Sequence, residues 1–260
     1  MTATVDALRL RPTHPMGAQV HATPHTAAHT AGASPTPTPQ AAGAATVPVI
    51  PFGEAGALSR SLDKDESLYL SGDEADNAYL IEAGLVSLSL DASPERERIL
   101  ALAGPGDIIG SLTPAPGRHL ETATALSANV VVSVLPRRAV DGAPLRYEDA
   151  LEEMIGRAAG DQLARLANAL ADTELPVPAR VARTMVRLAE RFGQQSAGGA
   201  MRLTLPITHD TIAAMVGAAR ETTTSVMQQL RREGLIEGTR GRYLFDPEAL
   251  RVYGHEAALG

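Results

Sequence analysis

The segment 207–245 constrains the fold more than any other part of the chain, because two helices, a turn and a hairpin follow one another at close spacing. Thr208 is placed to cap a helix whose first turn holds Asp210, near the positive end of the helix dipole. The pattern predicts about eight helical residues, a tight turn at Gly217, and about fourteen more helical residues over 220–233. This arrangement is typical of a helix-turn-helix motif.

A β-hairpin is predicted directly after the second helix. Residues 235–237 and 242–245 are β-prone, and they flank a glycine-bounded turn at 238–241. A hairpin in this place is the wing of a winged helix-turn-helix. Arg240 and Arg242 lie near its tip.

Groove geometry assigns roles to the polar residues of this segment. A recognition helix enters the major groove of double-stranded DNA by its N-terminal end, so the residues predicted to read base edges are Arg220, Glu221, Thr224 and Ser225. An arginine there can donate two hydrogen bonds to guanine, and a glutamate can accept one from cytosine. The residues predicted to contact phosphates, which position a protein without specifying sequence, are Thr208, Thr222, Arg231, Arg232, Arg240 and Arg242. An ordinary helical hairpin with a solvated polar face is the alternative.

The region before this motif is predicted to be mostly β. Short β-prone runs, separated by turns and without a helix between them, indicate an antiparallel sandwich or roll; they are 67–70, 77–82, 85–90, 98–102 and 130–135. Asp73, Glu74 and Asp76 fall in one of the turns, as a solvated acidic loop.

A long amphipathic helix is predicted over 147–171, and its apolar stripe can pack on the β unit or against its own copy in a dimer. The stripe consists of Leu151, Met154, Ile155, Ala158, Leu163, Leu166 and Leu170. A second helix is predicted up to Gly193, followed by a polar loop over 194–200 and a short strand over 201–205.

Net charge is informative only by region. The whole chain carries −7, which opposes binding to nucleic acid. Residues 48–179, however, carry −11, whereas residues 180–260 hold 11 arginines and 8 acidic residues, a net charge of +3. An acidic unit joined to a mildly basic one indicates two domains with different partners. The basic unit is the one that contains the predicted DNA-binding motif.

Composition excludes several classes of protein. The chain has no cysteine, which excludes disulfides, thiolate zinc sites, iron–sulfur clusters and cysteine nucleophiles. It has no apolar run of about 18 residues and no signal peptide, so we expect a cytoplasmic protein that does not enter a membrane. It shows no paired carboxylates at a loop mouth and no nucleophile elbow, so we predict that it is not an enzyme.

The first 47 residues are rich in Ala, Thr, Pro and His and poor in large apolar residues, which predicts a disordered tail. His21, His25 and His29 are four residues apart, as metal ligands on one helical face would be. Pro24 would break such a helix, so no metal site is predicted.

With these features together, the sequence resembles the cyclic-AMP receptor protein / fumarate-nitrate regulator (CRP/FNR) superfamily of bacterial transcription regulators. The resemblance covers roughly residues 48–253, through strand–glycine–strand signatures at 79–86 and 104–110 and the Arg-Glu-Thr element that begins at Arg220. It implies an α+β fold: an antiparallel β-roll sensor domain like those that bind cyclic nucleotides (48–142), a long dimerisation helix (143–174) and a winged helix-turn-helix domain (175–260).

The predicted sensor departs from the cyclic-AMP-binding members. Their ribose-binding glutamate follows the last glycine of the second signature, and further on an arginine and a hydroxyl residue bind the cyclic phosphate. Here Gly110 is followed by Ser111, and the arginine place falls at Glu121-Thr122, where a carboxylate would repel a phosphate. Arg118 is the nearest arginine.

The long helix presents Arg165 and Leu166 where those members place small hydroxyl side chains. These departures predict a degenerate effector pocket, no dependence on cyclic AMP and no cofactor. Two alternatives stay open, an unknown ligand in the roll or cyclic AMP held by a changed pocket. His119, the only histidine of the β region, is expected on a loop surface rather than as a haem ligand. A second arginine of the recognition helix is replaced by Ser225, which predicts weaker discrimination at one base pair, by about 1–3 kcal/mol.

The resulting hypothesis is a homodimeric regulator that binds an inverted repeat in double-stranded DNA. The resemblance implies an activator that contacts RNA polymerase, in preference to a repressor. The alternative is a small-molecule sensor whose C-terminal domain docks a protein partner, since a regional charge of +3 is modest.

Overall fold

The structure is a computed structural model that describes residues 58–93, 96–111, 117–136 and 148–259. The predicted tail over 1–47 and its histidines lie outside these residues, as does the predicted boundary between sensor domain and long helix near residue 143.

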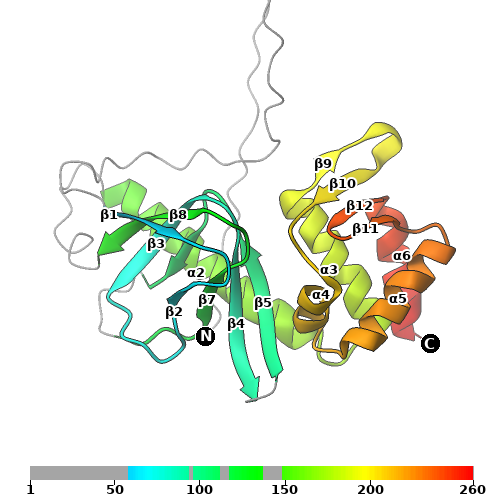
Figure 1. Ribbon diagram of the computed structural model, residues 1–260, viewed down its shortest axis with the longest axis horizontal. Coiled ribbons are helices and arrows are strands. Elements are labelled where there is room, and N and C mark those ends of the chain that lie inside the picture. Colours follow the sequence, from blue (N-terminus) through cyan, green and yellow to red (C-terminus); the bar gives the residue numbers. More distant parts are fainter. Residues whose placement is uncertain (1–57, 94–95, 112–116, 137–147, 260) are drawn as a thin grey trace, which may run out of the picture. The chain divides into compact units, whose positions relative to one another are not determined.

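The described β region contains eight strands, all paired antiparallel. They are β1 (Leu58–Leu62), β2 (Ser67–Tyr69), β3 (Asn77–Ala83), β4 (Val86–Ser93), β5 (Arg96–Ala103), β6 (Ile108–Gly110), β7 (Thr122–Ala125) and β8 (Val130–Pro136). They form two four-stranded sheets, in the orders β1-β8-β3-β6 and β2-β7-β4-β5 (Figure 1).

One apolar core is built from residues of both sheets. Ile81, Val86, Leu88 and Val132 are fully buried in it, because alternate residues of each strand face inward. Gly84 turns the chain between β3 and β4 with φ 84°, and a Cβ atom there would lie 2.9 Å from the Cα atom of Val130. The predicted antiparallel roll is confirmed.

Three strands were not predicted from the sequence pattern. The segments β6 and β7 have three and four residues, too few to show alternation, and β7 reads Thr-Ala-Thr-Ala, without a large apolar residue. The strand β1 begins at Leu58, whose side chain is exposed. All three are held by long-range pairing, β1 and β6 in one sheet and β7 in the other.

Helix α2 (Glu148–Ala171) changes its surroundings along its length. Met154 is buried with Ala78 of β3 and Ile108 of β6, so the first turns pack on the β region. Leu163 and Leu170, in the second half, are 69% and 72% exposed. The first half of the helix therefore packs on the β region, as one expectation had it. The second half keeps exposed apolar residues that a second copy of the chain could cover, as the other expectation had it.

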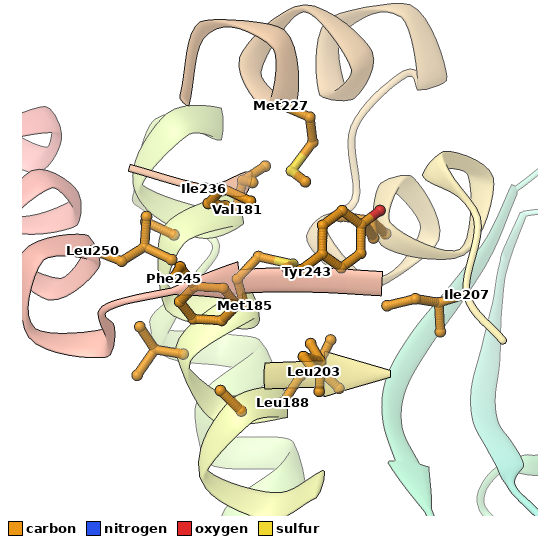
Figure 2. Packing of buried hydrophobic residues seen from close by; sticks show 14 of the residues in the cluster. Val181, Met185, Leu188, Leu203, Ile207, Met227, Ile236, Tyr243, Phe245 and Leu250 are labelled. Carbon is orange, nitrogen blue, oxygen red and sulfur yellow. The ribbon is translucent and has the colours of Figure 1, made fainter. Parts of the chain in front are cut away.

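The C-terminal region combines five helical segments with a four-stranded sheet. The elements are α3 (Val177–Phe192), β9 (Gln194–Gln195), the 3₁₀ turn η3 (Ala197–Gly199), β10 (Met201–Thr204), α4 (His209–Val216), α5 (Arg220–Arg232), β11 (Glu237–Thr239), β12 (Arg242–Phe245) and α6 (Pro247–Leu259). The sheet order is β11-β12-β10-β9. Figure 2 shows its side chains packed against α3, with Met185, Leu203, Tyr243 and Phe245 at the centre.

Two predictions for this region need correction. The polar loop after Gly193 contains β9, which pairs with Met201 and Arg202 of β10. The first wing strand lies at β11 rather than 235–237, because Ile236 is drawn into the core beside Leu230.

Helix α6 is missing from the predicted elements. Leu250 is fully buried, and Gly254 packs closely on α3, where a Cβ atom added to it would lie 3.1 Å from the Cβ atom of Ala182. Two small residues in contact give little apolar periodicity. Among the described residues, no helix combines the length and the hydropathy needed to cross a membrane.

Candidate nucleic-acid interface

The first helix of the motif begins at a complete capping box. The Thr208 hydroxyl accepts a hydrogen bond from the Thr211 backbone N–H, and the Thr208 N–H donates to the Thr211 hydroxyl, both at 3.2 Å. Gly217 ends α4 in the left-handed region, with φ 60° and ψ 48°, and starts the turn to α5. The predicted cap and the predicted turn are confirmed.

Recognition helix α5 has one buried face and one polar face. Thr223, Val226, Met227 and Leu230 are buried in the domain core. The predicted base-reading residues Arg220, Glu221 and Ser225 are exposed, and Thr224 is half-buried. The fold thus presents these four side chains on the face left uncovered by the core.

Arg220 is exposed yet oriented. Its Nε atom lies 3.3 Å from Oδ1 of Asp210, and the two side chains are 65% and 59% exposed. A pair this open to water contributes little to stability. It holds the guanidinium across the N-terminal ends of α4 and α5, and it can be exchanged for a DNA contact at small cost.

The predicted phosphate contacts fall into two groups. Arg232, Arg240, Arg242 and Thr222 are exposed, with Arg240 in the two-residue turn between β11 and β12. Arg240 and Gly241 both have positive φ, as a tight hairpin turn requires. Thr208 is engaged in its capping box, and Arg231 is half-buried inside the domain.

Arg231 belongs to a polar network that the sequence pattern does not identify. Its Nε donates to the Gly238 carbonyl in β11 at 2.9 Å, and one terminal nitrogen lies 3.4 Å from Nε2 of His209. The other ring nitrogen of His209 lies 3.0 Å from the Thr224 hydroxyl. The only available signal is a histidine in the first turn of the first helix, which in sequence looks like any surface residue of the motif.

A buried ion pair joins the β roll to α2. Glu121 is 5% exposed, and its Oε1 lies 3.4 Å from a terminal nitrogen of Arg165 in α2. Burial raises the pKa of Glu121, and the Arg165 guanidinium opposes this rise. Two residues of the predicted effector pocket are therefore brought together, 44 positions apart in sequence.

Four other residues of the predicted pocket make contacts of their own. Arg118 is exposed and donates to the Gly72 carbonyl at 2.6 Å, and the Thr122 hydroxyl accepts from the Ser71 N–H at 3.0 Å. Leu166 is 39% exposed. Gly110 has φ 83°, and a Cβ atom there would lie 2.8 Å from the Asn77 carbonyl oxygen, so this turn has no room for a side chain.

His119 contradicts its predicted place on a loop surface. It is 6% exposed and stacks on Tyr69, with ring centroids 3.7 Å apart and an interplanar angle of 12°. Burial lowers the pKa of His119 and raises that of Tyr69. The turn containing Gly72 draws the ring inward, since the His119 N–H and carbonyl both bond to that turn.

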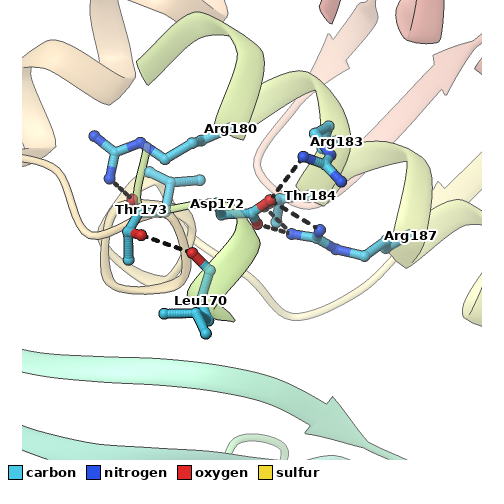
Figure 3. A network of polar contacts seen from close by, with 8 residues as sticks. Leu170, Asp172, Thr173, Arg180, Arg183, Thr184 and Arg187 are labelled. Atoms are coloured by element: carbon cyan, nitrogen blue, oxygen red, sulfur yellow. Dashed lines mark hydrogen bonds and ion pairs between the residues drawn. The ribbon is translucent and has the colours of Figure 1, made fainter. Parts of the chain in front are cut away.

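A second buried carboxylate joins α2 to α3 (Figure 3). The carboxylate oxygens of Asp172 lie 2.5 Å from a terminal nitrogen of Arg187 and 3.4 Å from one of Arg183. Arg187 also donates to the Thr184 hydroxyl at 3.1 Å. This network fixes the start of the C-terminal region to the end of α2. Among the residues that the structure describes, no group of three or more His, Asp or Glu side chains could hold a metal ion.

Family models match two separate parts of the chain. A cyclic nucleotide-binding domain matches residues 59–144, and a Crp-like helix-turn-helix domain matches residues 179–253. The CRP-like cAMP-activated global transcriptional regulator of Mycobacterium tuberculosis is 33% identical over 175 residues, which are 66% of this chain and 77% of that protein. The transcriptional regulator LdrP of Thermus thermophilus is 32% identical over 190 residues, 72% of this chain and 92% of that one.

Solved structures agree with the sequence comparison. A CRP-family transcriptional regulator from Thermus thermophilus is 29% identical with a TM-score of 0.61, over 76% of this chain and 98% of that one. FixK2 from Bradyrhizobium japonicum, at 22% identity, shares the fold with a TM-score of 0.64 over 77% and 96% of the two chains. With its winged helix-turn-helix and its β roll, the chain belongs to the CRP/FNR family of transcription regulators.

Proposed function

We propose that the protein acts as a homodimer that binds an inverted repeat in promoter DNA and activates transcription without cyclic AMP. The observation that carries the DNA-binding part is the outer face of α5, where Arg220, Glu221 and Ser225 are exposed beside a wing with two exposed arginines. Arginine and glutamate at the N-terminal end of such a helix suit guanine and cytosine edges in the major groove.

The dimer is supported by the second half of α2. Leu163, Leu166 and Leu170 recur at three- and four-residue intervals and are exposed, so they form an apolar stripe on one side of the helix. A two-fold axis along this stripe would bury it, and an inverted repeat requires the two recognition helices to be about 34 Å apart, one turn of DNA. Met154, by contrast, is buried against the chain's own β strands.

The dimer has a direct test. Replacing both Leu163 and Leu170 with Glu places charges on the stripe, and sedimentation should then give a monomer. Glu153→Ala, on an exposed position of the same helix, is the matched control and should sediment as the unchanged protein does. A dimer that survives the double substitution would contradict this interface.

Independence from cyclic AMP is supported by the Glu121–Arg165 pair. The relative from Mycobacterium tuberculosis is described as cAMP-activated. In this chain a carboxylate lies where the resemblance places the phosphate-binding arginine, and it is already neutralised by Arg165. A cyclic phosphate would have to displace that carboxylate from its partner and then lie beside it.

Footprinting with the purified full-length protein on its own promoter region, with and without cyclic AMP, tests the proposal. We expect protection of an inverted repeat in both conditions, with equal affinity, and increased transcript from that promoter when RNA polymerase is added. Protection that appears only with cyclic AMP would contradict ligand independence. Absence of any protected sequence would favour a domain that docks a protein.

A further inference from the structure

Three side chains link the first helix of the motif, the recognition helix and the wing. His209 in α4 contacts Thr224 in α5 through Nδ1 at 3.0 Å and Arg231 through Nε2 at 3.4 Å. Arg231 donates from its Nε to the Gly238 carbonyl of β11 at 2.9 Å. The His209 imidazole therefore lies between the Arg231 guanidinium, which is bonded to the wing, and the Thr224 hydroxyl on the recognition helix.

The chemistry of the partners fixes the proton on His209. An arginine side chain only donates hydrogen bonds, so Nε2 of His209 must accept, and the ring proton must be on Nδ1. The imidazole is accordingly neutral and donates from Nδ1 to the Thr224 hydroxyl oxygen. Burial and the charges of Arg231 and Arg220 lower the pKa of His209, against the opposing charge of Asp210, which agrees with the neutral ring.

Thr224 is left with a hydrogen to donate. Its oxygen accepts from His209, and in the described part of the chain the hydroxyl makes no other hydrogen bond. The side chain is half-buried on the same helix turn as the exposed Ser225, so it retains an opening to solvent. A donor that enters an interface without an acceptor costs free energy, so its partner on DNA must supply an acceptor atom.

We propose that His209 is a positioning residue for base readout, which turns the Thr224 hydroxyl into a donor toward a base edge in the major groove. The inference rests on the proposed DNA-binding function, and it predicts which bases are accepted at one position of the site. Guanine, adenine and thymine each present an acceptor there, whereas the cytosine edge presents an amino donor. Thr224 therefore disfavours cytosine at the base that it contacts.

The test uses two histidine replacements that separate the two ring nitrogens. The amide nitrogen of Asn lies at the place of Nδ1, so His209→Asn keeps a donor for Thr224. The amide of Gln lies at the place of Nε2, so His209→Gln keeps a partner for Arg231 but loses that donor. Thr224→Val removes the hydroxyl with little change of shape, and the double variant His209→Gln/Thr224→Val completes a cycle.

Each full-length protein is taken through binding-site selection, and its Kd is then measured on the selected site and on every single-base change of it. We expect the unchanged protein and His209→Asn to disfavour cytosine at one base pair of each half-site by about two- to tenfold, the range of one neutral hydrogen bond. His209→Gln and Thr224→Val lose this preference, and the double variant shows no further loss. Affinity for unrelated DNA and the midpoint of thermal unfolding stay unchanged.

Two outcomes would overturn the inference alone. In one, the unchanged protein selects a site but His209→Gln retains its preference at every base pair. In the other, His209→Gln and Thr224→Val weaken binding equally for all bases, as a phosphate contact would. If the unchanged protein selects no sequence at all, the proposed function fails together with the inference.

Discussion

Two ion pairs differ in their exposure to water: the one between the β roll and α2 is buried, and the one at the helix-turn-helix is exposed. In the roll, the Glu121 side chain is 6% exposed and faces Arg165, whose own side chain is 16% exposed. In the C-terminal region, Arg220 is paired with Asp210, yet both side chains are more than half exposed. The same type of ion pair thus occupies an interior in one region and a rim in the other.

The difference separates stability from recognition. A buried pair is costly to break, because the remaining charge is left without water or a partner. An exposed pair is easily exchanged, because water already screens it. We therefore expect substitutions in the buried Glu121–Arg165 pair to change the free energy of unfolding, and substitutions of exposed residues on α5 to change the affinity for DNA.

Replacing Arg165 with Met is expected to have the largest effect. It leaves the Glu121 carboxylate buried and unpaired, and it lowers the free energy of unfolding by about 3–5 kcal/mol at pH 7. Burial already raises the pKa of Glu121, and loss of the opposing Arg165 charge raises it further. The folded state then binds the proton more readily than the unfolded chain, so the deficit grows as the pH rises above the ordinary glutamate pKa and shrinks toward pH 5.

Urea unfolding at pH 5 and pH 8 measures this deficit. Arg118→Met is the matched control, because Arg118 is exposed on the same roll. It should change the free energy of unfolding by no more than about 0.5 kcal/mol at either pH. If the two variants lose the same free energy of unfolding, the Glu121–Arg165 pair does not stabilise the roll more than an exposed arginine does.

Replacing Arg220 with Ala comes next in magnitude. Loss of a two-hydrogen-bond contact to guanine should weaken specific binding by about 1–3 kcal/mol, while the urea midpoint stays where it was. Fluorescence anisotropy on the protected repeat gives the affinity. Lys64→Ala, an exposed cation of the β region, serves as the control for loss of one positive charge and should leave specific binding unchanged.

A change at Thr208 tests whether any part of the outer face also supports the fold. Thr208→Ala removes the capping box of α4 and should lower the free energy of unfolding by about 1 kcal/mol. Thr208→Ser keeps the hydroxyl and should restore that loss. If both variants unfold like the unchanged protein while DNA binding falls in Thr208→Ala, the hydroxyl serves phosphate contact rather than capping.

The smallest effect is expected for Asp210→Asn. Removing an exposed carboxylate frees Arg220 and takes a negative charge away from the phosphates, so the affinity for DNA should rise by about 0.5 kcal/mol. Titrations at low and moderate salt measure the change. A fall in affinity would mean that Asp210 orients Arg220 for guanine. The exposed pair would then have a structural role, as the buried pair does.

The elements predictable from sequence are those with a local signature. Thr208, Gly217 and the apolar face of α5 identify the helix-turn-helix within a span of about 25 residues, because caps, turns and helical periodicity are properties of near neighbours. The same holds for α2 and for the longer strands of the roll. Short segments such as β7 lack a period and acquire their structure from their partners.

Side-chain partners are set by the tertiary fold. Glu121 and Arg165 are both unusual as pocket residues in sequence, but their pairing depends on where α2 lies on the roll. The prediction for His119 is wrong because a turn in another part of the sheet draws it against Tyr69. The His209–Thr224–Arg231 network spans two helices and a hairpin, so no spacing rule along one element reveals it.

The division of α2 has a consequence for how such a regulator responds to its own amount. Met154 is buried within a single chain at any concentration, whereas Leu163 and Leu170 are left exposed by the residues that the structure describes. With the proposed dimer, occupancy of an inverted repeat in dilute conditions grows with the square of the monomer concentration. With the proposed dimer and no effector in the roll, the number of copies in the cell would therefore set promoter occupancy.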